Sequence, residues 1–401
     1  MIVLVMSSWE TFREEMPVTK DYCYFNHAAV GPLPKTTSNI LKKIAEEQLA
    51  GDVLVDIEEI LAGFPDTRKE IANLINANSE EIALTMATAH GIGLILTSLD
   101  WNKRRNSGII INDMEYNSNS FPYQMVCRRN PAVWLHVLKS RSSNGARFLD
   151  FADFEEIFET QRISLVAVSH VQFTNGFRID LRKLAKMAHN HGALLLVDGI
   201  QSVGAINLDV KETDIDFLSA GGVKWMLGPE ASGFLYVKSN LLEELNPVLV
   251  GSLSDENPLD FQHHEFHPRK NALKLQGCFL PQNRALGASI AFLNRYGIRN
   301  IENQIKKLTD YLIDQISQKV PAARVESLRG QAASGIVRIT FPDGVNTKGV
   351  VKSLREKYRI ITAYRSGGLR ASPHCYNIIE EIDAFIDGMK KQLETSTDVQ
   401  K

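Results

Sequence analysis

Short, mostly apolar runs alternate along this chain with longer segments in which apolar residues recur every three or four positions. Four of these runs, at 108–112, 165–169, 193–197 and 233–237, are typical of strands buried on both faces. Helical spacing fills the segments between them, most clearly at 182–190. This alternation predicts an α/β fold with a large domain built on a mostly parallel, doubly wound sheet.

The pattern changes after residue 240, where an irregular stretch leads into mixed strands and helices. We therefore expect a large domain over 20–280 and a smaller α+β domain made of 1–19 and 281–395. Residues 396–401 form a polar end that we expect to fray. Further helices are predicted over 8–19 (ended by Pro17), 35–50, 53–76, 283–318 (with a break at Gly297), 347–357 and 378–394.

Composition narrows the class of protein. The 401 residues fit about two domains, and a formal net charge of −2 offers no basic surface for nucleic acid or an anionic membrane. The apolar opening at 1–6 is too short to span a bilayer and has no basic residues before it. The four cysteines lack the spacing of a zinc site or a disulfide framework. We expect a soluble, cytoplasmic enzyme with a small-molecule substrate.

Two neighbouring strand ends carry the most informative side chains. Asp198 follows the apolar run at 193–197, and Gln201 comes three residues later. Lys224 follows a second apolar pair at 217–218 through a glycine-rich loop. An acid and a lysine at adjacent strand ends suit pyridoxal phosphate, since the lysine can hold its aldehyde and the acid can keep its ring nitrogen protonated.

Other polar residues allow two interpretations each. Thr88 is placed as the N-cap of a helix, which is either an ordinary cap or an anion site for a phosphate. Asn26 and His27 stand before a Gly/Pro turn, where turn chemistry alone accounts for them.

A histidine-rich segment raises the question of a metal. The candidates are His263, His264, Glu265 and His267, but Pro258 and Pro268 bracket them too closely for the helix that would align two histidines. We interpret the segment as a solvated loop and expect no metal.

The motifs, taken in order, resemble one family. They are YFNHAAVGPLP at 24–34, VDGIQ at 197–201, GGVKWMLGP at 221–229 and LRASPHCYNIIEEID at 369–383. The chain resembles the fold-type I pyridoxal phosphate enzymes of the class V aminotransferase group. That group includes cysteine desulfurases, selenocysteine lyase-like and isopenicillin-epimerase-like proteins, and kynureninases.

The resemblance implies a role for each cofactor-binding residue. Lys224 would form the Schiff base with the cofactor as an internal aldimine, Asp198 would contact the pyridine nitrogen, and Gln201 would donate to the phenolic oxygen. Thr88 and the backbone of Ala89 would hold the phosphate.

It also implies the remainder of the site. Tyr116 would stack on the cofactor ring, and Arg370 would bind the carboxylate of the substrate. Asn26 and His27 would line the substrate pocket. The family further implies a homodimer with its active sites at the subunit interface.

Three departures from the family pattern limit how far the function carries over. The loop at 364–368 lacks the nucleophilic cysteine of the desulfurases, and Cys375 comes after Arg370. Residues 221–223 replace the usual hydroxyl before the lysine, for which Ser219 is a candidate. Cys278 replaces the threonine that reaches the neighbouring subunit's phosphate.

The reaction itself stays open at this level. Amino-group transfer is our first expectation, and a lyase that cleaves a C–S or other β-bond is the alternative, together with an epimerase. A protein that binds the cofactor without catalysis is a further reading. A dinucleotide-binding dehydrogenase is disfavoured because the chain has no GxGxxG run.

Overall fold

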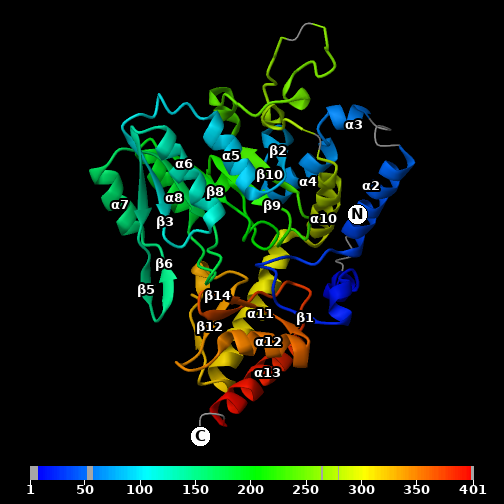
Figure 1. Ribbon diagram of the computed structural model, residues 1–401, viewed down its shortest axis with the longest axis vertical. Coiled ribbons are helices and arrows are strands. Elements are labelled where there is room, and N and C mark those ends of the chain that lie inside the picture. Colours follow the sequence, from blue (N-terminus) through cyan, green and yellow to red (C-terminus); the bar gives the residue numbers. More distant parts are fainter. Residues whose placement is uncertain (1–7, 52–56, 263–264, 279, 399–401) are drawn as a thin grey trace, which may run out of the picture.

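The computed structural model describes residues 8–51, 57–262, 265–278 and 280–398. Its centre is a seven-stranded sheet with the order β2-β10-β9-β8-β7-β3-β4 (Figure 1). The pairs β3–β4, β3–β7, β7–β8 and β8–β9 are parallel, while β10 runs antiparallel to both of its neighbours. These strands are β2 (Ile82–Thr85), β3 (Ser107–Asn112), β4 (Val133–Leu138), β7 (Ile163–Ser169), β8 (Leu194–Asp198), β9 (Phe217–Gly221) and β10 (Gly233–Val237). The predicted mostly parallel sheet is confirmed.

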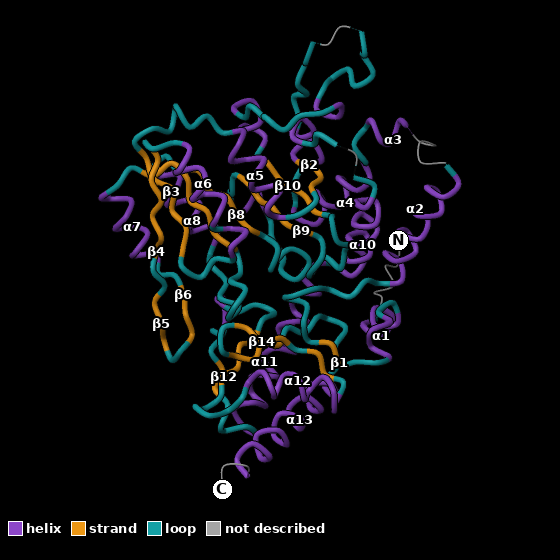
Figure 2. Tube along the Cα trace, in the orientation of Figure 1, coloured by secondary structure: helices purple, strands orange, loops and turns teal. Residues whose placement is uncertain are grey.

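Helices cover both faces of this sheet, as Figure 2 shows. Ile109 and Ile111 of β3 pack in one apolar cluster with helices α5 (Thr88–Ser98) and α6 (Phe121–Arg129). Ile110, which points the other way, belongs to the cluster that includes four other helices: α4 (Pro65–Ile75), α7 (Phe151–Thr160), α8 (Leu181–Asn190) and α10 (Gln282–Tyr296). A strand buried on both faces has no polar side to present, which is why these strands are mostly apolar in the sequence.

A second, antiparallel sheet of four strands has the order β11-β12-β15-β14 and lies below the large sheet in Figure 1. Three helices share one apolar core with it: α11 (Ile298–Lys319), α12 (Thr347–Tyr358) and α13 (Ile379–Asp398). Its strands are β11 (Arg324–Val325), β12 (Val337–Thr340), β14 (Ala363–Arg365) and β15 (Gly368–Ala371). Helix α10 was predicted to belong to the smaller domain, but it packs against α2 and α4, which were predicted to belong to the large one. The predicted boundaries of the two domains therefore stay predictions.

The remaining elements complete the chain. Strand β1 (Cys23–Tyr24) pairs in parallel with β13 (Ile360–Ile361), and β5 (Arg141–Ser143) forms a hairpin with β6 (Ala146–Phe148). The other α-helices are α1 (Trp9–Glu14), α2 (Lys35–Ala50), α3 (Ile57–Leu61), α4 (Pro65–Ile75), α7 (Phe151–Thr160), α8 (Leu181–Asn190), α9 (Val210–Thr213), α10 (Gln282–Tyr296), α11 (Ile298–Lys319), α12 (Thr347–Tyr358) and α13 (Ile379–Asp398). Short 3-10 helices lie at Pro17–Lys20, Ser79–Glu81, Asn117–Asn119, Ser239–Glu244, Ser252–Ser254, Ala272–Leu275 and Gly330–Ala332.

Three helix predictions need correction. The helix predicted over 53–76 is two helices, α3 and α4, because Phe64 precedes a proline and takes a left-handed conformation with φ of 55°. The helix predicted over 8–19 ends at Glu14, and Pro17 begins a separate 3-10 helix. Helix α13 continues to Asp398, beyond the predicted start of the frayed end, while residues 399–401 lie outside the described part.

The break predicted at Gly297 is confirmed, and it separates α10 from α11 with a φ of 77°. Among the described residues, no helix combines the length and the apolar character needed to cross a membrane.

Candidate functional site

Asp198 and Lys224 lie at the carboxyl edge of the large sheet. Asp198 is the last residue of β8, and its side chain is buried. One carboxylate oxygen accepts a hydrogen bond from the backbone N–H of Ile200 at 2.9 Å. Burial raises the pKa of Asp198, and the negative charge of nearby Glu115 raises it as well. The hydrogen bond from the Ile200 N–H and the positive charge of Lys224 act in the opposite direction and lower it. The acid therefore needs a positive group beside it to remain charged.

Lys224 follows the adjacent strand β9 and responds to the same charges. Burial lowers the pKa of Lys224 from its ordinary value, Asp198 raises it, and Arg370 and Arg365 lower it further. A lysine held in this way offers a neutral amine at lower pH than an exposed lysine does, which suits a nucleophile or a base.

Gln201 ties the loop after Asp198 to the lysine loop. Its side-chain oxygen accepts from the indole N–H of Trp225 at 2.9 Å, and its amide nitrogen donates to the carbonyl of Ala28 at 2.9 Å. The orientation of the amide is therefore set by two buried contacts. Its predicted contact with the cofactor stays a prediction.

A glycine brings the N-terminal turn against the lysine. The N–H of Gly31 donates to the carbonyl of Val223 at 2.7 Å. A Cβ at Gly31 would meet the carbonyl oxygen of Lys224 at 2.0 Å, so only glycine fits at this position. The predicted Gly/Pro turn thus forms one wall of the lysine loop.

The start of helix α5 is fastened to strand β9. Thr88 is the first residue of the helix and Ala87 is its N-cap, so the predicted N-cap role of Thr88 is wrong. The hydroxyl of Thr88 instead accepts from the N–H of Gly221 at 2.9 Å, and the Ser219 hydroxyl donates to the carbonyl of Thr88 at 2.9 Å. The Ser219 hydroxyl is thereby engaged in holding the helix. Ala89, in the first turn, is exposed, and N–H groups there have no acceptor within the helix.

Arg370 is a buried cation with spare donors. It lies on β15, is 1% exposed, and donates through Nη1 to the carbonyl of Phe173 at 2.6 Å. Its Nε and Nη2 are buried and have no hydrogen-bond partner among the described residues. Burial, with Arg365 adding to it, lowers the pKa of Arg370 to about 9. Two unpaired donors on one buried guanidinium match the two oxygens of a carboxylate.

The structure places His27 away from open space. Its side chain is fully buried, with Nδ1 2.9 Å from the Ser372 carbonyl and Nε2 2.7 Å from the Tyr376 hydroxyl. Both nitrogens are therefore engaged within the protein, and the predicted place of His27 in the substrate pocket stays a prediction. Asn26 pairs with Ser372 through a backbone bridge and keeps a buried Oδ1 without a partner among the described residues.

Tyr116 and Cys278 are exposed. Tyr116 packs edge-on against Phe173, with ring centroids 5.2 Å apart. Phe173 is also the residue whose carbonyl accepts the hydrogen bond from Arg370, so Tyr116 lies near Arg370. The stacking role of Tyr116 and the phosphate role of Cys278 stay predictions.

A carboxylate network beside the site was missed in the sequence. Glu115 accepts hydrogen bonds from Asn112, from Asn119 Nδ2 (2.8 Å), from the N–H and hydroxyl of Ser169 (2.8 and 2.5 Å) and from Gln172 Nε2 (3.0 Å). Asn112 and Ser169 end β3 and β7, while Asn119 and Gln172 lie in the segments that follow these strands. The signal was the run of polar residues after each strand, but their convergence on one acid depends on the packing of the two loops.

The histidine-rich segment gives no metal site that can be described. His263 and His264 lie outside the described residues. Among the described residues, no cluster of three or more histidine, cysteine or acidic side chains could hold a metal ion.

The residues present fit pyridoxal phosphate. A buried acid and a lysine with a lowered pKa share one edge of the sheet, the first turn of α5 is open at Ala89, and Arg370 keeps unpaired donors. The acid and the lysine suit the ring of the cofactor and its aldehyde, and the first turn of α5 suits its phosphate. The donors of Arg370 suit the carboxylate of an amino acid.

Comparisons with known proteins agree with this fit. The model of the family described as Aminotransferase class-V matches residues 24–385. A protein of Methanothermobacter thermautotrophicus named "Probable cysteine desulfurase" is 28% identical over 412 residues, which cover 94% of this chain and 96% of that protein.

Two solved structures have the same fold. A cysteine desulfurase from Thermococcus onnurineus, solved in its apo form, aligns with a TM-score of 0.83 and 23% identity over 96% of this chain and 98% of that chain. The cystine C–S lyase C-DES, solved with its reaction product cysteine persulfide, aligns with a TM-score of 0.83 and 21% identity over 93% of this chain and 98% of that chain.

Proposed function

Because the chain belongs to the class V aminotransferase family and is a pyridoxal phosphate enzyme, we propose that it is a carbon–sulfur lyase. Its substrate would be an α-amino acid with sulfur on the β-carbon, such as cysteine or cystine. This reverses the order of our two expectations, since amino-group transfer came first from the sequence. Relatives named as desulfurases and a structural neighbour named as a C–S lyase support the alternative better.

One observation carries the choice of a lyase over a persulfide-forming desulfurase. The hairpin between β14 and β15, where desulfurases carry their nucleophilic cysteine, turns through Ser366 and Gly367. Cys375 is fully buried, and burial raises the pKa of its thiol well above the ordinary value. Neither position offers a thiolate to take up sulfur, so the sulfur would leave with a small molecule.

The chain's own residues divide the work. Arg370 would bind the substrate carboxylate through Nε and Nη2, the two donors left unpaired. Lys224 would hold the cofactor and then, as a neutral amine, take the proton from the α-carbon. Asp198 would face the ring nitrogen, and the bound cofactor supplies the electron sink that makes the α-proton acidic.

The bonds balance as an elimination. The α-C–H bond breaks, its proton passes to Lys224 Nζ, and the electron pair forms a double bond as the β-C–S bond breaks. The sulfur leaves with its electron pair and takes up a proton. From cysteine, addition of one water then gives pyruvate, ammonia and hydrogen sulfide.

A homodimer is part of the proposal. Pro122, Met125 and Val248 line one cavity of about 400 Å³ on the side of helices α5 and α6. Large apolar side chains are exposed in the same segments and beside the site: Met86, Tyr116, Phe121, Met125, Val248, Leu249 and Val250. A face of this kind is typical of a surface that a partner covers, and we propose that a second copy covers it. A cytoplasmic location stays a prediction.

The test is a product analysis of the holoenzyme. We expect cysteine or cystine to give sulfur product and pyruvate in equal amounts, with no conversion of the cofactor to its amine form. Lys224→Ala should abolish both products. Conversion to the amine form with release of a keto acid would establish amino-group transfer instead, and no change with any amino acid would favour a silent cofactor-binding protein.

A further inference from the structure

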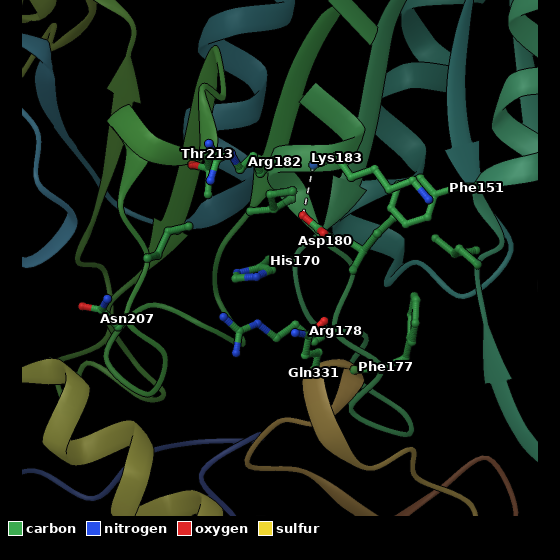
Figure 3. Close-up of a pocket in the computed structure, with 15 residues that line it drawn as sticks. Phe151, His170, Phe177, Arg178, Asp180, Arg182, Lys183, Asn207, Thr213 and Gln331 are labelled. Atoms are coloured by element: carbon green, nitrogen blue, oxygen red, sulfur yellow. Dashed lines mark hydrogen bonds between the residues drawn. The ribbon is translucent and has the colours of Figure 1, made fainter. Parts of the chain in front are cut away.

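A cavity of about 580 Å³ lies beside the start of helix α8 (Figure 3). It is bounded by loops at the carboxyl edge of the large sheet and by the short helix Gly330–Ala332. None of the residues assigned above to the cofactor or the substrate lines it, so this is a separate site.

The most buried polar side chain that lines this cavity belongs to His170, the residue that follows β7. Its side chain is only 3% exposed, and its Nδ1 is buried with no hydrogen-bond partner among the described residues. Burial and the nearby Arg178 lower the pKa of His170 well below its ordinary value, so the ring is neutral at pH 7. A buried, unpaired ring nitrogen costs stability unless a ligand or water satisfies it.

The mouth of the cavity is predominantly basic. Arg182 and Lys183 are exposed in the first turn of α8, where the helix dipole also favours an anion. Arg178 is held by Glu302 at 2.7 Å and extends below His170 in Figure 3. The acid at the mouth, Asp180, is the N-cap and accepts from the N–H of Lys183 at 3.0 Å.

The partners of these cations leave them available. Arg182 approaches Glu212 at 3.5 Å, but both side chains are largely exposed, at 73% and 67%, and such a pair is weak. Lys183 lies over the ring of Phe151, with Nζ 4.2 Å from its centroid. Neither contact buries the charge, so both cations can turn to a ligand.

The walls are apolar. Four apolar residues line the cavity together with His170 and the basic side chains: Leu149, Phe151, Phe177 and Ile179. Phe177, Leu149 and Ile179 are nearly buried, and together they offer a surface for a flat or branched hydrocarbon group.

We propose that this cavity binds a small organic anion with an apolar body. The body would lie against Phe151 and Phe177 and reach the ring of His170. A carboxylate or a phosphate would lie at the start of α8, beside Arg182 and Lys183.

The site adjoins the cofactor site through the backbone. The N–H of His170 donates to the carbonyl of Asp198 at 3.0 Å, and the preceding residue Ser169 holds Glu115. A ligand that contacts His170 would thus lie one residue away from Ser169, which binds Glu115.

The test measures binding to the cofactor-loaded enzyme by calorimetry. Phenyl phosphate and benzoate are the two probes, which separate a phosphate ligand from a carboxylate ligand. Loading with cofactor keeps phenyl phosphate out of the cofactor's phosphate site. We expect saturable binding of at least one probe, weakened about fivefold or more in Arg182→Ala/Lys183→Ala. His170→Phe, which fills the cavity floor, should weaken it as well.

The matched control is Lys186→Ala, an exposed cation of the same helix that does not line the cavity. It should leave the affinity unchanged. The proposal is overturned if neither probe binds, or if the double variant binds as tightly as Lys186→Ala. The surface variants keep the test decisive even if His170→Phe fails to fold.

Discussion

The indole N–H of Trp225 donates to the side-chain oxygen of Gln201 at 2.9 Å. Trp225 directly follows Lys224, and Gln201 is three residues beyond Asp198. One buried hydrogen bond therefore joins the loop that follows Asp198 to the loop that carries Lys224. This bond fixes the position of the two loops relative to each other.

Trp225→Phe should remove this hydrogen bond and weaken the connection between the two loops. The variant keeps an aromatic ring but leaves the Gln201 oxygen buried and unpaired, at a cost of about 1–3 kcal/mol. We expect the dissociation constant for pyridoxal phosphate to rise about fivefold or more, as measured by equilibrium titration of the apoenzyme. The control is Trp101→Phe, which loses an equivalent bond to the carbonyl of Leu96 (2.8 Å) in a different apolar cluster, the one that includes α5 and α6. Equal cofactor affinity in the two variants would contradict the positioning role.

Arg370→Lys should separate substrate binding from cofactor binding. An ammonium group cannot present two donors to a carboxylate as the guanidinium does. We expect KM for the amino acid to rise about tenfold or more while the cofactor absorption spectrum stays unchanged. Arg324→Lys, an exposed arginine of the same sheet, should leave KM as it is. An unchanged KM in Arg370→Lys would remove Arg370 from the substrate site.

The pH dependence of cofactor incorporation should follow the charges around Lys224. Its reactive form is the neutral amine, so the rate should rise with pH through a midpoint below the ordinary lysine value of 10.5. Arg365 lowers the pKa of Lys224, and Arg365→Ala should shift the midpoint to higher pH. Asp198 raises it, and Asp198→Asn should shift the midpoint to lower pH. Stopped-flow absorbance of the apoenzyme with pyridoxal phosphate measures both shifts, and a shift of opposite sign in either variant would refute this account.

Glu115→Gln should destabilise the protein. Donors from Asn112, Asn119, Ser169 and Gln172 all point to this carboxylate, and a glutamine would direct its own N–H₂ at some of them. We expect the free energy of unfolding to fall by about 2 kcal/mol, as measured by urea denaturation. Glu159→Gln, on the exposed side of α7, is the control and should change it little. Equal stability of the two variants would show that the hydrogen bonds to Glu115 add nothing to the free energy of unfolding.

Some of the site could be predicted because its signals are local. Asp198 and Lys224 each follow a short apolar run, and the ends of adjacent parallel strands meet at one edge of a sheet. The break at Gly297 and the Gly/Pro turn at Gly31 likewise depend on a few neighbouring residues. For such features the order of residues along the chain was sufficient.

Other features depend on contacts between residues far apart in the sequence. The hydroxyl of Thr88 was predicted as a helix cap, but it bonds to Gly221, 133 residues away. Both ring nitrogens of His27 have partners from the far end of the chain, Ser372 and Tyr376. A local pattern cannot show which distant partner will compete for a polar group.

The sequence by itself therefore determined the α/β fold and the family, and it predicted the acid and the lysine of the candidate cofactor site, because periodicity and strand ends are properties of short segments. Only the tertiary structure decided which polar groups remain unpaired. Arg370 keeps two free donors and His170 one unpaired nitrogen among the described residues, because the elements packed around them bury each side chain without supplying a partner.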